Sequence, residues 1–297
     1  MVWRGVMPAV TTPFNTDMTV DHGFLAKHVG WLVDHGSKGI VALGSLGEGA
    51  TLTHVEKRAV LKTCVETADG HVPVIAGVSA LSTDEAIELA HHAERLGCSG
   101  LMVLPPYVYK GSWDEMRAHF SAVMNATGLS CMLYNNPVAY GTDVVPEQVL
   151  ELADTHSNLH AVKESSTDVR RISGIRALLG DRLAIFVGVD DAIYEGMAVG
   201  AVGWIAGLVN AMPRESIELF ELCRRKEWGL AFDLYSWFLP LLRLDTVPKF
   251  VQLIKLVQQE VGMGNERVRA PRYVLSGAER DEAMAVITSS LATRPSF

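Results

Sequence analysis

The segment His160-Ala-Val-Lys-Glu-Ser-Ser166 places a lysine at the end of a short apolar run. A charged ammonium group at the end of such a run needs a counter-charge, water or a chemical role. One interpretation is a lysine at a strand terminus that reaches solvent or pairs with Glu164. The other is a nucleophilic amine at the end of a buried strand. Residues elsewhere in the chain bear on this choice.

Seven other short apolar runs also end in turn residues. With the run before Lys163, the series covers residues 6–10, 39–43, 73–78, 100–104, 130–134, 159–163, 184–188 and 201–206. Runs that are apolar throughout, without polar alternation, are typical of strands that are covered on both faces, as in a parallel sheet. We therefore predict eight parallel strands.

The segments between these runs have helical periodicity. Helices are predicted around residues 24–32 and over residues 55–68, 83–96 and 113–124. Thr53 with Glu56, and Ser82 with Glu85, fit capping boxes at two helix starts. Strands that alternate with helices at this spacing favour an α/β fold, a (β/α)8 TIM barrel, over an open doubly wound sheet.

The C-terminal part of the chain is also helical in pattern. Apolar stripes cover residues 213–225, 228–242, 247–261 and 277–292. We expect a barrel over residues 1–220 and, over residues 221–297, a helical extension that packs on the barrel. The Arg267-Val-Arg-Ala-Pro-Arg272 cluster is expected to form an exposed loop of this extension.

The composition of the chain limits the classes of function that it can have. The chain has 297 residues, a formal net charge of −8 and a pI near 5.7, which provide no basic surface for nucleic acid or anionic lipid. The cysteines lack the spacing of metal ligands and are interpreted as reduced thiols of a cytoplasmic protein. They are Cys64, Cys98, Cys131 and Cys223. We expect no export signal and no membrane-spanning segment.

In such barrels the reacting groups lie where strands end. The second run is followed by Gly44-Ser-Leu-Gly-Glu48, where Gly44 and Gly47 let the backbone approach a ligand and consecutive N–H groups form an anion site. The Gly-Lys-Ser/Thr ending of a phosphate-binding loop is missing, so a carboxylate is the expected anion. An ordinary glycine turn is the alternative interpretation.

Three other strand ends carry candidate site residues. The fifth run ends in Tyr134, whose hydroxyl is expected close to Lys163, unless it is only a barrel tyrosine bonded to backbone. After the seventh run, Gly188-Val-Asp-Asp191 is interpreted as a substrate-contacting loop or as a pair of helix caps. After the eighth, the segment around Ile205 either lines the site or packs the end of the barrel.

These residues carry a family resemblance. Gly44-Ser-Leu-Gly-Glu48, Leu104-Pro-Pro-Tyr107, Tyr134-Asn-Asn-Pro137 and Val162-Lys-Glu164, in this order, resemble the motifs of the dihydrodipicolinate synthase / N-acetylneuraminate lyase family of class I aldolase-type enzymes. The resemblance covers nearly the whole chain. It implies a TIM barrel with C-terminal helices, assembled as a homo-oligomer, dimer or tetramer, that needs no metal and no organic cofactor.

The resemblance also implies a role for each matching residue. Lys163 would form a Schiff base with the carbonyl or imine carbon of a small 2-oxo acid or imino acid, with Tyr134 as general acid and base. Ser45 would pass protons between Tyr134 and a tyrosine across the dimer interface, at the position of Tyr107. Substrate binding is assigned to the backbone around Ser45 and to the following residues: Gly44, Leu46, Gly47, Gly188 and Ile205.

A Schiff base requires the neutral amine, so an apolar pocket is expected around Lys163. The protonated imine is an electron sink that serves C–C cleavage, C–C formation, loss of water or loss of ammonia, so the lysine alone does not determine the reaction. Two departures from the family pattern narrow the choice. Ala139 stands where lysine-pathway synthases carry a carboxylate-binding arginine, and Leu46 replaces a second hydroxyl.

A substrate with one carboxylate fits this pattern best. The expected reaction is deamination of 1-pyrroline-4-hydroxy-2-carboxylate to 2-oxoglutarate semialdehyde. Aldol cleavage or dehydration of a 2-keto-3-deoxy sugar acid is the alternative, and dihydrodipicolinate synthase activity is disfavoured by Ala139 and Leu46. A different class of function is a catalytically silent barrel that binds a keto acid. An intact set of Ser45, Tyr134 and Lys163 favours the enzyme, because a mere binder needs no hydroxyl relay.

Overall fold

A computed structural model describes residues 1–296. Its centre is a parallel sheet of eight strands in the order β1-β8-β7-β6-β5-β4-β3-β2. The strands are β1 (Gly5–Pro8), β2 (Ile40–Ala42), β3 (Val74–Val78), β4 (Gly100–Val103), β5 (Ser130–Asn135), β6 (Leu159–Glu164), β7 (Ala184–Val187) and β8 (Gly203–Ala206). A parallel bridge between Ala9 and Val41 joins β1 to β2, so the sheet curls into a barrel.

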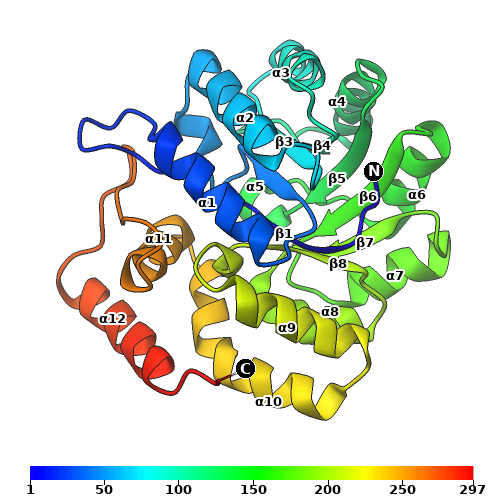
Figure 1. Ribbon diagram of the computed structural model, residues 1–297. Coiled ribbons are helices and arrows are strands. Elements are labelled where there is room, and N and C mark those ends of the chain that lie inside the picture. The colour runs from blue at the N-terminus through cyan, green and yellow to red at the C-terminus, as the bar shows by residue number, and fades with distance from the viewer. Residues whose placement is uncertain (297) are drawn as a thin grey trace.

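Eight helices lie outside the barrel wall, and Figure 1 shows them arranged around it. They are α1 (His22–Asp34), α2 (His54–Ala68), α3 (Thr83–Arg95), α4 (Trp113–Asn125), α6 (Pro146–Thr155), α7 (Arg170–Leu179), α8 (Ile193–Ala198) and α9 (Pro213–Arg224). The short α5 (Pro137–Tyr140) directly follows β5. The predicted TIM barrel and all eight of its strands are confirmed, because uniformly buried apolar runs require cover on both faces.

The predicted helix caps are confirmed in one case and only half formed in the other. Thr53 and Glu56 make the complete reciprocal capping box of α2. At α3 the Ser82 hydroxyl accepts from the Glu85 N–H, but the Glu85 carboxylate accepts from the Leu81 N–H instead. The second half of that box is therefore wrong.

Three further helices form the C-terminal extension: α10 (Trp228–Leu242), α11 (Phe250–Glu260) and α12 (Gly277–Ala292). They lie together on one side of the barrel (Figure 1). Residue 221, the predicted start of the extension, lies inside α9, the helix that follows β8. A short 3₁₀ turn, η4 (Arg243–Asp245), connects α10 to the segment before α11.

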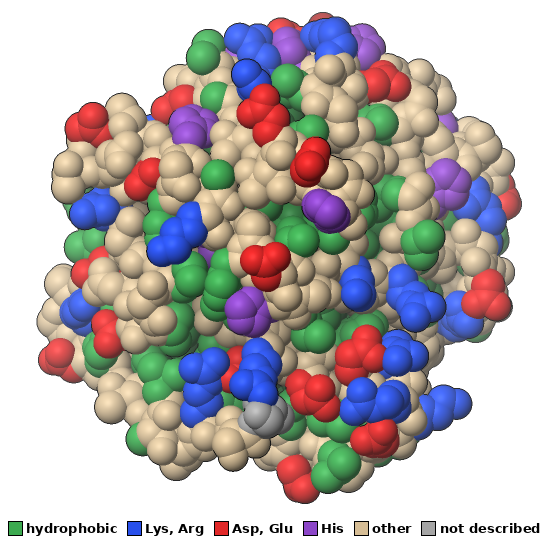
Figure 2. Space-filling view, in the orientation of Figure 1, with side chains coloured by type: hydrophobic (Ala, Val, Ile, Leu, Met, Phe, Trp, Pro, Cys, Tyr) green, Lys and Arg blue, Asp and Glu red, His purple; other side chains and the backbone are tan. Residues whose placement is uncertain are grey.

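The molecular surface mixes both signs of charge. On the face shown in Figure 2, acidic and basic side chains are interspersed rather than collected into one field. Within the described part of the chain, no helix combines the length and apolar character that crossing a bilayer requires.

Candidate active site

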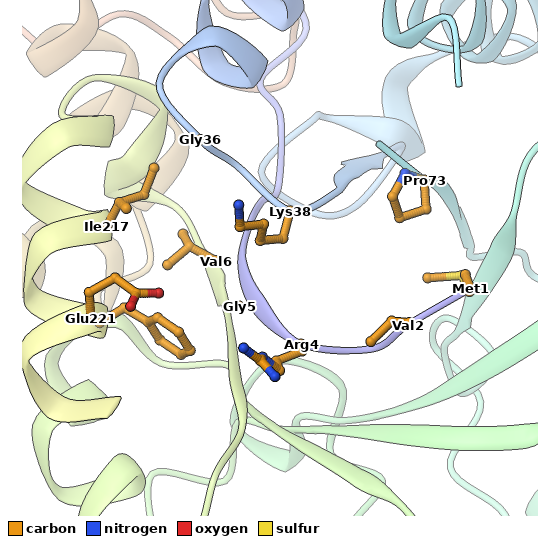
Figure 3. A pocket seen from close by; sticks show the side chains of 11 residues that line it. Met1, Val2, Arg4, Gly5, Val6, Gly36, Lys38, Pro73, Ile217 and Glu221 are labelled. Carbon is orange, nitrogen blue, oxygen red and sulfur yellow. The ribbon is translucent and has the colours of Figure 1, made fainter. Parts of the chain in front are cut away.

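Two cavities lie at opposite ends of the barrel. The smaller, about 320 Å³, is at the amino ends of the strands, where Arg4, Lys38 and Glu221 surround it (Figure 3). The larger, about 500 Å³, is at the carboxyl ends and is lined by residues that end or follow most of the strands. TIM-barrel enzymes place their chemistry at the carboxyl end. The larger cavity is therefore the candidate site.

Lys163 projects into this cavity from the end of β6. Its side chain is buried, with an exposed fraction of 6%, and Nζ lies 4.1 Å from the centroid of the Tyr134 ring. Among residues 1–296 no carboxylate forms an ion pair with this amine. A nucleophilic amine requires such an apolar, unpaired setting, because an ion pair would hold it in the charged form.

Glu164, the alternative partner of Lys163, points to the other face of β6. Its carboxylate accepts from Asn135 Nδ2 at 3.0 Å and from the Ser166 N–H at 2.6 Å. Successive side chains of a strand alternate between its two faces, which separates Glu164 from Lys163. The interpretation of Lys163 as one half of an ion pair with Glu164 is therefore wrong.

Tyr134 and Lys163 are register partners on neighbouring strands, β5 and β6. The Tyr134 hydroxyl accepts a hydrogen bond from Asn136 Nδ2 at 3.0 Å. Asn136 thereby fills one acceptor position and leaves the phenolic proton available to the cavity.

Ser45 does not bond to Tyr134 directly. Its hydroxyl forms a short hydrogen bond with the hydroxyl of Tyr140, on α5 of the same chain. The Tyr140 ring packs on two other tyrosines, 5.8 Å from the Tyr134 ring and 5.6 Å from the Tyr107 ring between centroids. Sequence reasoning missed Tyr140, because nothing local marks a residue 95 positions from Ser45 as its partner.

The expected interface tyrosine, Tyr107, lines the cavity of its own chain. Burial raises the pKa of Tyr107, while hydrogen bonding to neighbouring hydroxyls acts in the opposite direction. Burial also holds the pKa of Tyr140 well above its ordinary value, and the neighbouring Tyr134 and Tyr107 act in the same direction. Tyr107 and Tyr140 therefore keep their protons at neutral pH and can both accept and donate hydrogen bonds.

The turn after β2 presents backbone donors to the cavity. Gly44, Ser45 and Leu46 line it, and the N–H groups of Ser45 and Leu46 have no acceptor among the described residues. Unpaired consecutive N–H groups form a concave site for an anion such as a carboxylate. Gly47 does not line the cavity; its carbonyl accepts from the Thr12 hydroxyl at 2.6 Å. In the structure Gly47 therefore belongs to the turn and not to the cavity wall, and its contact with substrate stays a prediction.

Glu48 anchors the same turn to the C-terminal extension. It has a left-handed backbone conformation, with φ 53°, and its buried carboxylate contacts Lys255 Nζ of α11 at 2.6 Å. It also accepts from the Arg269 N–H at 2.9 Å. Burial lowers the pKa of Lys255 to about 8, against the attraction of Glu48. Glu48 thus fixes the position of the turn after β2, and its carboxylate does not face the centre of the cavity.

Gly188 and Ile205 both line the cavity, as predicted for substrate contacts. A Cβ at Gly188 would lie 2.7 Å from Lys163 Cε, so only glycine leaves room for the lysine side chain. Asp190, two residues later, is not a helix cap. Its carboxylate accepts from Trp204 Nε1 and from the Gly207 and Leu208 N–H groups, which ties the β7 end to the β8 end.

The C-terminal extension contributes two charged residues that the sequence analysis did not assign to the site. Asp245, at the end of η4, and Arg272 both line the cavity. The expectation of an exposed loop around Arg272 is wrong, because Arg269 binds Glu56 and Arg272 lies 3.7 Å from Glu48. Contacts between residues more than 200 positions apart leave no local pattern in the sequence.

Within the part of the chain that the structure describes, no group of three or more His, Cys, Asp or Glu side chains is arranged to hold a metal ion. The four cysteines are buried and unpaired with one another. The groups available for chemistry in the cavity include the amine, the hydroxyls, the backbone donors, the carboxyl of Asp245 and the guanidinium of Arg272.

The chain is similar to many known sequences. A model of the dihydrodipicolinate synthetase family matches residues 2–290. The 4-hydroxy-tetrahydrodipicolinate synthase of Agrobacterium fabrum (strain C58 / ATCC 33970) is 35% identical over 91% of this chain and 92% of its own length. The enzyme of the same name from Rhizobium meliloti (strain 1021) is 33% identical over 96% of each chain.

Solved structures agree with this match. Dihydrodipicolinate synthase from Aquifex aeolicus superposes with a TM-score of 0.92 at 28% identity, covering 97% of this chain and 98% of that one. A prophage protein of this family from E. coli K12, solved in complex with pyruvate, gives a TM-score of 0.92 at 26% identity over 98% and 99% of the two chains. The chain therefore belongs to the dihydrodipicolinate synthetase family and is a lyase of that family.

Proposed function

We propose that the protein forms a Schiff base between Lys163 and a small 2-oxo acid or cyclic imino acid. The observation that carries this proposal is the buried, unpaired amine of Lys163 packed 4.1 Å from the Tyr134 ring centroid, in the main cavity at the carboxyl end of the barrel. Membership of a family in which relatives bind pyruvate supports it.

Proton transfer is assigned to the hydroxyls around the amine. Tyr134 takes and returns protons at the carbon next to the imine, because it lines the cavity directly beside the amine. Ser45 and Tyr140 form the adjoining hydrogen-bonded pair, and Tyr107 packs on Tyr140. The N–H groups of Ser45 and Leu46 bind the carboxylate next to the reacting carbon.

The reaction we infer is deamination of 1-pyrroline-4-hydroxy-2-carboxylate to 2-oxoglutarate semialdehyde. This substrate has one carboxylate for the backbone donors and an imine carbon for Lys163. The position of the second-substrate arginine of lysine-pathway synthases is Ala139, which lines the cavity and offers no cation. A side chain without charge suits a compact monocarboxylate better than a second acidic substrate.

One observation favours a second candidate. Arg272 supplies a guanidinium group to the cavity from the C-terminal extension, although Glu48 at 3.7 Å already balances part of its charge. A cation there offers an alternative to the missing arginine for a second carboxylate. Condensation of pyruvate with aspartate semialdehyde, the reaction implied by the names of the curated relatives, is therefore the second candidate.

Borohydride trapping with peptide mapping tests the proposal. The protein is reduced in the presence of 1-pyrroline-4-hydroxy-2-carboxylate, a 2-keto-3-deoxy sugar acid or pyruvate, and ammonia release and condensation with aspartate semialdehyde are assayed in parallel. We expect an adduct on Lys163 with the pyrroline substrate, together with ammonia release. An adduct that accompanies only turnover of the sugar acid would make the protein an aldolase or dehydratase of that acid. An adduct that accompanies only the condensation would make it a dihydrodipicolinate synthase.

Two variants make the result specific to the lysine. Lys163→Ala should abolish the adduct and all turnover while leaving the circular dichroism spectrum unchanged. Lys57→Ala, which removes a buried lysine of α2 outside the cavity, should keep both. An adduct in Lys163→Ala would refute the Schiff base at this residue, and no adduct in the wild type would favour the silent keto-acid-binding barrel.

A further inference from the structure

The reaction assigned to Lys163, Tyr134 and Ser45 gives no role to the Asp245 carboxyl, which also lines the cavity. Asp245 ends η4, the turn that carries the C-terminal extension across the end of the barrel. It lines the same cavity as Lys163, and a Cβ at Gly207 would collide with its Oδ1, so the carboxyl lies directly against the backbone at the end of β8. The extension therefore places an acid group inside the reaction site.

An ionised carboxylate requires hydrogen-bond donors, and no described residue donates to this carboxyl. Its Oδ1 is shielded from solvent without a hydrogen-bond partner, and no donor to either oxygen is found among residues 1–296. The neighbouring Asp190 has the opposite surroundings, with hydrogen bonds from Trp204 Nε1 and two backbone N–H groups. Burial of an unpaired charge is costly, so Asp245 is the member of this pair that holds a proton.

The charged groups around Asp245 agree with this assignment. Burial holds the pKa of Asp245 well above its ordinary range, and Asp190 and Asp191 act in the same direction, while Lys163 acts against them. For Asp190 burial raises the pKa only to about 6, because its hydrogen bonds oppose the effect. Two carboxyls whose surroundings separate their pKa values in this way are typical of an acid held ready for proton donation.

The proposed reaction contains a step that needs such an acid. After the amine of Lys163 has displaced the ring nitrogen, the intermediate has a hydroxyl group on the carbon two bonds from the imine carbon. Tyr134 removes a proton from the carbon between them, a C=C bond forms, and the C–O bond breaks. Hydroxide is a poor leaving group, so it must leave as water, with a proton supplied by another group.

We propose that the Asp245 carboxyl group donates the proton with which this hydroxyl group leaves as water. The inference rests on the proposed function, since it concerns a step of that reaction. In the step, one C–H and one C–O bond break, the C=C bond forms, and the O–H proton of Asp245 moves to the departing oxygen. Asp245 is left ionised and recovers a proton when water hydrolyses the later intermediates.

Asp245→Asn tests this role, because the amide keeps the size of the side chain and an N–H donor but cannot transfer the proton. With pyruvate, which has no leaving hydroxyl, the borohydride adduct on Lys163 and the exchange of methyl protons in D₂O report the amine and Tyr134. In Asp245→Asn we expect the rates of adduct formation and of proton exchange to stay within about threefold of the wild type. The rate of elimination, followed as ammonia release, should fall by about 100-fold or more. The matched control, Asp233→Asn, changes an exposed carboxylate of α10 outside the cavity and should leave all three within about twofold of the wild type.

Two results would overturn the proposal. Ammonia release by Asp245→Asn within threefold of the wild type would mean that a hydrogen bond, without proton transfer, is sufficient. Loss of adduct and exchange in parallel with elimination would assign Asp245 to the positioning of Lys163 instead.

Failure of the proposed deamination is distinguishable from failure of this inference. If the wild type removes water from a 2-keto-3-deoxy sugar acid but releases no ammonia from the pyrroline substrate, the deaminase assignment fails, and Asp245→Asn is judged on the dehydration rate. If the wild type eliminates from neither substrate, both proposals are overturned.

Discussion

The hydroxyl of Tyr140 is the group in this cavity that the family motifs do not predict. It bonds to Ser45 Oγ, and its ring contacts the rings of Tyr134 and Tyr107. Because burial holds its pKa well above the ordinary value, Tyr140 keeps its proton, and in the proposed relay it would pass a proton along a hydrogen bond as a neutral hydroxyl rather than act as a phenolate.

We therefore expect Tyr140→Phe to lower kcat by about 100-fold, in the range typical of a lost proton-transfer group. The adduct with Lys163 should still form, because the amine and the backbone donors remain. Single-turnover kinetics combined with borohydride trapping measures the two steps separately. Asn158, whose side chain bonds backbone carbonyls at the start of β5, provides the control: Asn158→Ala should alter stability but not the ratio of the two rates. A Tyr140→Phe variant with wild-type kcat would exclude Tyr140 from proton transfer.

At the scale of elements, the turn after β2 and helix α11 form one unit through a buried ion pair. Glu48 and Lys255 are both nearly inaccessible to solvent, and their charged atoms lie 2.6 Å apart. A buried pair of this kind contributes little compared with an apolar pair, but removal of one partner leaves an uncompensated charge. The position of the anion turn therefore depends on a helix that begins some 200 residues later in the chain.

Lys255→Met should lower the free energy of unfolding by about 3 kcal/mol, because Glu48 keeps only the Arg269 N–H and the more distant Arg272. Urea unfolding curves measure the change. Lys249→Met, which breaks an exposed pair with Glu279, is the matched control and should cost less than about 1 kcal/mol. Equal losses in the two variants would show that the buried pair has no special role.

Helix α1 carries a buried histidine that links stability to pH. His28 is fully buried, and its Nε2 contacts the Asn210 carbonyl oxygen at 2.9 Å, at the end of the barrel next to β8. Burial lowers the pKa of His28 to about 4, against the opposing effect of that hydrogen bond. The unfolded chain therefore takes up a proton near pH 6.5, whereas the folded protein does so only near pH 4.

From this difference we predict that the contribution of His28 to the free energy of unfolding is complete above pH 6.5 and is lost as the pH falls towards 4. The total loss is about 3 kcal/mol. His28→Gln has no charge to gain, so the difference between wild type and variant should change by that amount over this window. Urea unfolding at pH 7, 6, 5 and 4.5 provides the curves, and parallel curves for the two proteins would contradict the prediction.

The barrel elements could be predicted from sequence because their signals are local. A strand that is buried on both faces appears in the sequence as an apolar run. A lysine or tyrosine at the end of such a run, such as Lys163 or Tyr134, is therefore easy to identify. The Glu85 carboxylate shows the limit of this reasoning. The N–H groups of Leu81 and Ser82 are both candidate donors to it, and in the structure it accepts from Leu81. Pairs that meet only through the fold, such as Glu48 with Lys255, 207 positions apart, have no signature in a single sequence.

At the scale of the whole molecule, each chain holds a complete set of the groups assigned to the reaction. Ser45, Tyr107, Tyr134, Tyr140 and Lys163 line one cavity. The residue after Tyr107, Val108, is 88% exposed and has a left-handed backbone conformation with φ 73°. Such a conformation is costly for a β-branched residue and marks a constrained loop tip, which directs Tyr107 inward while Val108 faces outward.

A mixing experiment decides whether the tyrosine acts within its own chain or across an interface. Lys163→Ala and Tyr140→Phe chains are coexpressed, and so are Lys163→Ala and Tyr107→Phe chains, each pair with two different affinity tags so that mixed oligomers can be isolated.

If every group comes from one chain, no site in a mixed oligomer has both the lysine and the tyrosine, and we expect no activity beyond that of the tyrosine variant alone. If Tyr107 were supplied by a partner, one of the two sites in each isolated mixed dimer would be complete, so the mixed dimers would have about half of wild-type activity. Such a recovery would place the relay across the interface and leave Tyr140 with a structural role. Its absence, with intact oligomers confirmed by sedimentation, would mean that the cavity of a single chain is sufficient for turnover.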